Sequence, residues 1–244
     1  MVKTVVKLLF VIFIVVLLVN GFVFLLKAEE NINRGHDAPR QPYVARILTR
    51  TSYCTGVILS DRAVTFARHC RVDGDALVFL GEHDLAVEDN EVVIQVTEFI
   101  TDIPTDLIIA ILPYRVRFND RIQSIPIATQ IENNTLFSLY GWGLLPDDTF
   151  PRILQTTNQI LYSNNKQIIC TRDYINESSA SSGDSGGPLI QNNKLVGIIS
   201  FLMTLNGTKN FTCAVNMIEL LPVITEKIES IPPVYELYFP IAGE

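Results

Sequence analysis

Short apolar segments separated by turn residues occupy most of this 244-residue chain. They recur at regular spacing between Val44 and Met217, and no long helical period interrupts them. Segments of this kind are typical of antiparallel β-sandwiches and β-barrels. The sequence therefore predicts an all-β fold. The expected strands are Val44–Leu48, Thr55–Leu59, Leu77–Leu80, Val92–Phe99, Leu107–Leu112, Leu136–Gly141, Ile153–Ile160, Gln167–Cys170, Leu195–Phe201 and Thr212–Met217.

A segment bounded by Pro113 and Pro126 divides the expected strands into two groups. We interpret it as a crossover between two lobes, at about residues 32–113 and 127–217. After the second lobe, apolar positions follow a helical period, which predicts a C-terminal helix at about residues 218–229. Residues 231–244 contain prolines and no clear period, so we expect an extended tail.

The N-terminal segment from Leu8 to Leu26 is apolar except for Asn20 and Gly21, and lysines precede it. This pattern indicates a secretory signal peptide at residues 1–28, cleaved after Gly21 or Ala28, or an uncleaved signal anchor. Both interpretations place the rest of the chain in the secretory lumen or outside the cell. We therefore expect a secreted, extracellular protein, with type II membrane anchoring before processing as the alternative.

Charge and cysteine content narrow the function classes. Residues 1–28 contain three of the 19 Lys+Arg residues and none of the 26 Asp+Glu residues, so the remainder carries a net charge of −10. An acidic domain without basic runs disfavours binding to nucleic acid or to anionic lipid. In a secreted chain, the four cysteines predict two disulfides rather than a metal site or thiol chemistry. Sequons for glycosylation begin at Asn133, Asn176, Asn206 and Asn210.

The hexapeptide from Gly183 to Pro188 surrounds one serine, Ser185, with glycines and places Asp184 beside it. Glycine allows a sharp turn and a close approach of backbone amides to a ligand. A serine on such a turn can act as a nucleophile, and the N–H groups of Gly183 and Ser185 could hold the oxyanion that forms on acyl transfer. A glycine-rich surface turn is the alternative, so the rest of the chain must supply a base and an acid.

His69 is the best candidate for the base among the three histidines. It follows an apolar run and precedes Cys70, and a bridge from Cys54 to Cys70 would pin the turn that carries it. A general base needs a fixed position and tautomer. Asp106 stands at the start of the apolar run 107–112, which suits a buried acid that orients the histidine.

Together these motifs resemble the chymotrypsin-like (trypsin-fold) serine proteases. Gly183–Pro188 is similar to the family's nucleophile motif, Ala67–Cys70 to its histidine motif and Asp106–Leu112 to its aspartate motif. The order His, Asp, Ser along the chain is also the family's order. The resemblance covers residues 32–230 and implies two six-stranded antiparallel β-barrels with a C-terminal helix.

The resemblance implies a role for each matching residue. Ser185 would attack the scissile carbonyl, His69 would take the proton and pass it to the leaving amine, and Asp106 would hold the histidine tautomer. The amides of Gly183 and Ser185 would form the oxyanion hole. It also implies the disulfides Cys54–Cys70 and Cys170–Cys213.

A substrate-binding region follows from the same resemblance. Ser200 matches the serine that supports the aspartate, and Phe201 lies on the strand that pairs with substrate. Ser179 falls at the base of the primary pocket, where trypsin-like members carry Asp, so a preference for Lys or Arg is not expected. Leu202 and Ala214 fall at or near positions where many relatives have Gly. This predicts a shallow pocket for small or medium apolar residues.

Ile32 matches the new N-terminus that family members expose on activation, and its α-ammonium would pair with Asp184. Residue 31 is Asn rather than the usual Lys or Arg, so a trypsin-like cut is not expected there. We predict a short propeptide, residues 29–31, removed by an exopeptidase or an Asn-directed protease. Some relatives bind Ca²⁺ in the loop that matches Glu82–Glu91, but a solvated acidic turn is the favoured interpretation here, so no cofactor is expected.

Two function classes fit the sequence. The first is a secreted, monomeric serine endopeptidase that acts on protein or peptide substrates and is open to protein inhibitors. The second is a catalytically silent homologue that acts as a binding or regulatory module. Asn31, and Phe66 at a position where relatives carry Ser or Thr, keep the second class open.

Overall fold

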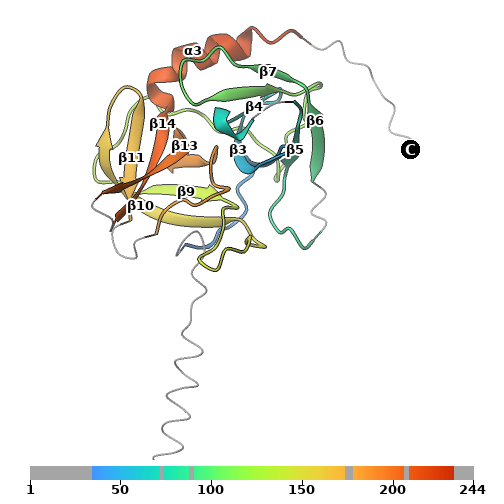
Figure 1. The fold of residues 1–244 in the computed structure, drawn as a ribbon. Coiled ribbons are helices and arrows are strands. Elements are labelled where there is room, and N and C mark those ends of the chain that lie inside the picture. The colour runs from blue at the N-terminus through green and yellow to red at the C-terminus, as the bar shows by residue number, and fades with distance from the viewer. Residues whose placement is uncertain (1–34, 72–73, 88–90, 174–177, 206–208, 234–244) are drawn as a thin grey trace, which may run out of the picture. The chain divides into compact units, whose positions relative to one another are not determined.

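The computed structural model describes residues 35–71, 74–87, 91–173, 178–205 and 209–233. They belong to one compact unit, residues 31–244. The all-β fold is confirmed: antiparallel strands form two sheets, and the helix α3 (Met217–Glu229) follows them (Figure 1). The predicted targeting segment, the propeptide and residues 234–244 lie outside the described residues. Within the described ranges, no helix is long and apolar enough to cross a membrane.

The first sheet has the strand order β6-β5-β2-β3-β4-β8-β7. Side chains alternate between more and less buried positions along β5 and β6, as expected for strands with one face toward a core. Only Thr97 separates β6 from β7, so one bent segment supplies both end strands and the sheet curls back on itself. The strands are β2 (Val44–Leu48), β3 (Tyr53–Ser60), β4 (Ala63–Phe66), β5 (Ala76–Leu80), β6 (Val92–Val96), β7 (Glu98–Ile100) and β8 (Ile108–Ile111).

The second sheet has the order β1-β10-β11-β14-β13-β12-β9, and a further pairing of β10 with β9 closes six of these strands into a barrel. The strands are β1 (His36–Asp37), β9 (Phe137–Gly141), β10 (Gln155–Asn164), β11 (Ile168–Arg172), β12 (Pro188–Gln191), β13 (Lys194–Leu205) and β14 (Lys209–Asn216).

The short strand β1 corrects the predicted lobe boundary. The sequence places residues 36 and 37 in the first lobe, but they pair with β10 of the second sheet. The pairing is possible because β11 covers only the second half of β10, which leaves one edge of its first half for β1. The side chain of Gln155 adds a hydrogen bond to Asp37 at 2.8 Å.

The helix α3 begins at Met217, one residue before the predicted start. The side chain of Asn216 caps it by accepting a hydrogen bond from the backbone N–H of Ile218 at 3.1 Å. Met217 and Ile224 are buried in an apolar cluster to which both sheets contribute. The helix therefore packs where the two sheets meet. Other members of this cluster include Val57, Ile109, Leu195 and Ile198.

Both expected disulfides are present. Cys54–Cys70 links β3 to the 3-10 turn η1 (Arg68–Cys70). Cys170–Cys213 joins β11 to β14, where the two cysteines stand directly opposite each other. The first disulfide therefore fixes the turn that carries His69, and the second fixes strand pairing inside the second barrel.

Removing either disulfide should destabilise the protein, but only one removal should also impair His69. Replacing Cys170 and Cys213 by alanine should cost about 4 kcal/mol, because the bridge spans a sequence separation of 43. Replacing Cys54 and Cys70, with a separation of 16, should cost about 3 kcal/mol. Urea unfolding measures both losses. Equal reactivity of Ser185 in the two folded variants would contradict the special role of the first bridge.

Candidate active site

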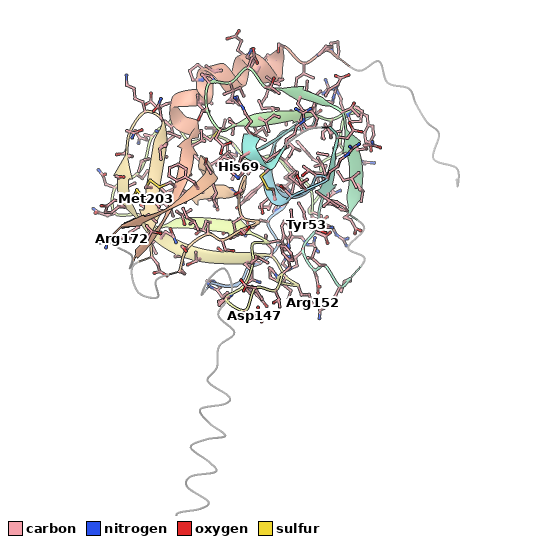
Figure 2. All side chains as sticks on the ribbon, viewed as in Figure 1. Tyr53, His69, Asp147, Arg152, Arg172 and Met203 are labelled. Carbon is pink, nitrogen blue, oxygen red and sulfur yellow. A yellow bond between two sulfur atoms is a disulfide. The ribbon has the colours of Figure 1, made fainter. Side chains whose placement is uncertain are left out.

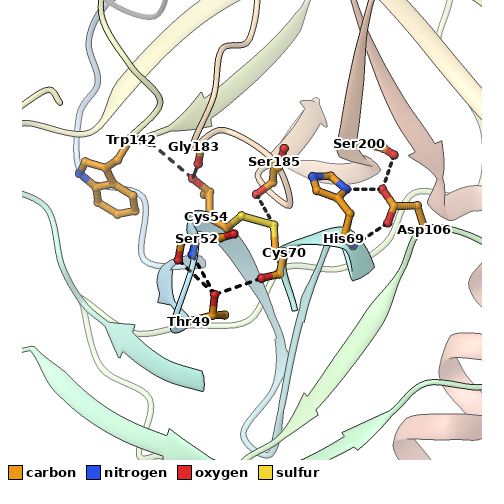
Figure 3. Close-up of a disulfide and its surroundings, with 11 residues drawn as sticks. Thr49, Ser52, Cys54, His69, Cys70, Asp106, Trp142, Gly183, Ser185 and Ser200 are labelled. Atoms are coloured by element: carbon orange, nitrogen blue, oxygen red, sulfur yellow. Dashed lines mark hydrogen bonds and ion pairs between the residues drawn. A yellow bond between two sulfur atoms is a disulfide. The ribbon is translucent and has the colours of Figure 1, made fainter. Parts of the chain in front are cut away.

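His69 and Asp106 meet because β4 and β8 are paired in the first sheet. His69 follows β4 in η1, and Asp106 precedes β8. The backbone N–H of His69 donates to Asp106 Oδ1 at 2.9 Å, and His69 Nδ1 lies 2.7 Å from Asp106 Oδ2. The hydroxyl of Ser200 in β13 donates to the same Oδ2 at 2.5 Å (Figure 3). His69 thus lies between the two sheets (Figure 2), linked through Asp106 to the second.

The hydrogen bonds set the charge states of this pair. Burial alone would raise the pKa of Asp106, but the hydrogen bonds from His69 and Ser200 lower that pKa to about 2. The hydrogen bond to Asp106 raises the pKa of His69 above its ordinary 6.5, although burial acts in the opposite direction. An ionised carboxylate can only accept, so Nδ1 carries the proton and Nε2 is left as the proton acceptor. Asp106 is 30% exposed, which is less buried than the sequence suggests.

Ser185 lies on a tight turn that is hydrogen-bonded to strand β3 of the first sheet. The backbone N–H of Thr55 donates to the carbonyl of Ser185 at 3.0 Å, and the Sγ of Cys70 is 3.7 Å from the same oxygen. Cys70 is the neighbour of His69, so this contact brings Ser185 next to the histidine (Figure 3). Gly186 adopts φ +85°, and a Cβ there would overlap the carbonyl oxygen of Thr55. Within the described residues no hydrogen bond joins Ser185 Oγ to the histidine ring.

Asp184 is fully buried beneath this turn. Its carboxylate accepts from the backbone N–H of Gly143 at 2.7 Å and of Ser181 at 2.8 Å. Burial raises its pKa to about 6, although these hydrogen bonds act against the increase. A Cβ on Gly143 would overlap the carboxylate, so the Gly-Trp-Gly turn (residues 141–143) can approach Asp184 closely only with glycine there. No cationic group among the described residues contacts Asp184, and Ile32 lies outside them.

The residues expected around the primary pocket gather between β13, β14 and the segment before Ser185. Ser179 is fully buried, and its hydroxyl has no hydrogen-bond partner within the described part of the chain. Leu202 is 44% exposed and stands opposite Thr212, a residue that the sequence did not single out. Ala214 instead stands opposite Ile199 and is buried in the barrel core.

The position of Thr212 follows from a β-bulge at Ser200. The register between β13 and β14 shifts between Ile199 and Phe201, which moves the partner of Leu202 by one residue. Thr212 is fully buried, and its hydroxyl accepts from the backbone N–H of Ala180 at 3.0 Å. Thr212, and not the expected Ala214, is therefore the residue of β14 that stands opposite Leu202. Phe201, the neighbour on β13, is 44% exposed.

Arg68 is a second residue that the motifs did not reveal. Its guanidinium donates to the carbonyl of Leu107 at 3.2 Å and also to the carbonyl of Ile103. These two carbonyls flank Asp106 in the chain. Arg68 therefore connects the turn of His69 to the loop of Asp106. In the sequence it is only a basic residue beside a histidine.

The structure describes only part of the acidic loop and only some of the sequons. Glu82 Oε2 lies 3.0 Å from Arg46 Nη2. Asp84 Oδ2 lies 2.6 Å from Nη2 of Arg152, which Figure 2 labels. Residues 88–90 lie outside the described ranges, within which no group of three or more His, Cys, Asp or Glu could hold a metal ion. Asn133 is exposed in a turn. Asn176, Asn206 and the side chain of Asn210 are not among the described groups.

Comparisons with known proteins found matches to most of this chain. A family model described as Trypsin matches residues 32–224. Human kallikrein-4 is 30% identical over 190 residues, which cover 68% of this chain and 72% of that protein. Trypsin from Xenopus laevis is 24% identical over 213 residues, which cover 78% of this chain and 87% of that protein.

A solved structure supports the fold. Neuropsin, a serine protease expressed in the limbic system of mouse brain, matches with a TM-score of 0.70 and 24% identity, over 80% of this chain and 98% of that one. The family model covers well over half of the sequence, including His69, Asp106 and Ser185. The chain belongs to the trypsin family, the chymotrypsin-like serine proteases.

Proposed function

We propose that the protein is a secreted serine endopeptidase that hydrolyses peptide bonds through an acyl-enzyme. The observation that carries the proposal is the hydrogen-bonded chain from His69 through Asp106 to Ser200, with Ser185 on a glycine turn beside it. An ionised carboxylate that orients a histidine next to a serine is the arrangement needed for nucleophilic acyl transfer. The kallikrein and trypsin relatives support the same reaction class.

The proposed reaction has two halves. Ser185 Oγ attacks the scissile carbonyl while His69 Nε2 takes its proton, and Asp106 stabilises the imidazolium. The amides of Gly183 and Ser185 bind the oxyanion of the tetrahedral intermediate. His69 then gives its proton to the leaving amine, which breaks the C–N bond. Water attacks the acyl-enzyme in the same way and restores Ser185. Side chains and backbone amides supply every group in this scheme, so we propose no cofactor.

We further propose that cleavage before Ile32 switches the enzyme on. Asp184 is a buried carboxylate whose described contacts are backbone and hydroxyl donors. An α-ammonium freed at Ile32 would neutralise this carboxylate and hold the turn of Ser185 in its active arrangement. The N-terminus of the active protein should then be Ile32, and sequencing of purified active protein tests this directly.

The alternative, a catalytically silent binding module, has less support. Phe66, which departs from the family pattern, is fully buried in the first core cluster, where it packs as an ordinary apolar residue. None of the groups that the reaction needs is replaced in the sequence. The unusual Asn31 concerns how the protein is processed rather than the chemistry of the site.

Labelling with a fluorophosphonate decides between the two functions. Processed protein should react at Ser185, and the labelling rate should fall as the pH drops through the raised pKa of His69, which lies above 6.5. Asp106→Asn should slow the reaction strongly, because an amide cannot hold the required histidine tautomer; the matching change in a well-studied member of this family lowers kcat by roughly 10⁴. Ser185→Ala is the control. Absence of Ser185-dependent labelling in processed protein would favour the binding module.

The protonation of Asp184 predicts different pH profiles for the unprocessed and processed chains. The folded unprocessed chain keeps this proton up to about pH 6, whereas the ordinary pKa is 3.8. This proton contributes folding stability on the order of 3 kcal/mol. The contribution is fully present below 3.8, the pKa of Asp184 in the unfolded chain, and is lost as the pH rises through about 6. In the processed chain the ammonium should lower the pKa of Asp184 and abolish this loss.

The measurement is thermal unfolding between pH 4 and pH 7.5, with Ser185→Ala in every chain to prevent self-digestion. Asp184→Asn is the matched control, because it removes the titrating group and keeps the shape of the side chain. The unprocessed chain that retains Asp184 should lose more stability with rising pH than the processed chain or the Asp184→Asn variant. Identical profiles for processed and unprocessed chains would contradict the switch.

The pair Leu202 and Thr212 predicts the cleavage preference. Both side chains occupy the strands expected to wall the primary pocket, and Ser179 at its base is uncharged. We expect small or medium apolar residues on the acyl side of the cleaved bond. Replacing Leu202 and Thr212 together by glycine should raise kcat/KM for large aromatic residues by about tenfold or more, because the pocket deepens. A peptide-library profile dominated by Lys or Arg would overturn the assignment.

A further inference from the structure

Thr55 of the first sheet makes hydrogen bonds to three residues at or near the turn of Ser185. It is fully buried in β3, directly after the disulfide-bonded Cys54. Its hydroxyl donates to the carbonyl of Gly183 at 3.0 Å and accepts from the backbone N–H of Trp142 at 3.4 Å. Its own backbone N–H donates to the carbonyl of Ser185 at 3.0 Å. Figure 3 shows Trp142, Gly183 and Ser185 around the Cys54–Cys70 disulfide.

The side chain of Thr55 is closely packed on two sides. A Cβ on Gly141 would lie 3.1 Å from Thr55 Oγ1, and one on Gly187 would lie 3.3 Å from Thr55 Cγ2. The side chain thus fits between the Gly-Trp-Gly turn and the turn of Ser185. A buried hydroxyl in such a place needs hydrogen-bond partners, and the structure supplies backbone groups of both turns.

The carbonyl that Thr55 holds belongs to one of the two residues of the proposed oxyanion hole. Gly183 has φ +107°, and without a Cβ it has few internal restraints on its rotation. A bond to its carbonyl limits that rotation and so limits where the neighbouring amides point. We infer that Thr55 is a positioning residue for the oxyanion hole, an inference that rests on the proposed peptidase function.

Loss of the Thr55 hydroxyl should affect the transition state rather than substrate binding. The oxyanion exists only after Ser185 has attacked, so misplaced amides should lower kcat and leave KM nearly unchanged. One hydrogen bond of ordinary net strength corresponds to about a tenfold change. Thr55→Val should lose about this much in kcat, and Thr55→Ser, which keeps the hydroxyl, should stay close to the parent enzyme.

The matched control is Thr156→Val. Thr156 is also buried, and its hydroxyl donates to the carbonyl of Leu139 at 2.8 Å. Among the described residues, its side chain makes no hydrogen bond to residues 183–187. This variant loses a buried hydrogen bond of the same kind inside the second barrel. It should lower the melting temperature without changing kcat.

The test compares two ligands on the processed protein. A peptide aldehyde ending in alanine forms a hemiacetal with Ser185 and uses the oxyanion hole, whereas the matching peptide alcohol does not. In Thr55→Val the aldehyde should bind about tenfold more weakly and the alcohol equally well. Parallel loss of both ligands, or the same behaviour as Thr156→Val, would overturn the inference.

Amide hydrogen exchange over residues 181–187 gives a readout that needs no activity. Asp184 N–H donates to Ser181 O at 3.1 Å, and Gly187 N–H donates to Asp184 O at 2.9 Å. Thr55→Val should speed exchange of these amides, and Thr156→Val should not. If the parent protein fails to label at Ser185, the proposed function fails, but faster exchange in Thr55→Val alone still supports the positioning role. Unchanged exchange would refute it in either case.

Discussion

A buried carboxylate governs the local structure around Ser185. Asp184 has no exposed surface, and its charge is met by the amides of Gly143 and Ser181. Removing a carboxylate from water is costly unless donors surround it, so both turns must curve toward it. The turn of Ser185 is thereby folded over Asp184.

The site also depends on two sheets that share it. The first sheet supplies His69 and Asp106 through the pairing of β4 with β8, and the second supplies Ser200 and Ser185 through β13 and the turn before β12. Hydrogen bonds across the boundary connect Asp106 to Ser200 and Thr55 to Ser185. A change in how the sheets meet would therefore alter the positions of His69 and Ser185 together.

The sequence predicted what depends on local pattern. Alternating apolar runs located most strands, and the glycine-rich motif located Ser185. The strands β1 and β12 were not among the expected strands, and β4 was noted only as the apolar run before His69. β1 has only two residues, and β12 begins within the glycine-rich motif. Thr212 and Thr55 could not be found, since their positions depend on a bulge in β13 and on a contact between residues 128 apart in sequence. Whether Asp184 meets Ile32 stays a prediction, because Ile32 is not described.

The small strand β1 has a consequence for any chain end created before Ile32. The backbone of His36, four residues after Ile32, belongs to a strand that pairs with β10 of the second sheet. Four extended residues reach roughly 14 Å, so the freed end could explore only a small volume around that anchor. Confinement of this kind corresponds to an effective concentration in the millimolar range or above. The new terminus would thus bind as an intramolecular ligand, and even weak intrinsic affinity for its site would suffice to keep it bound.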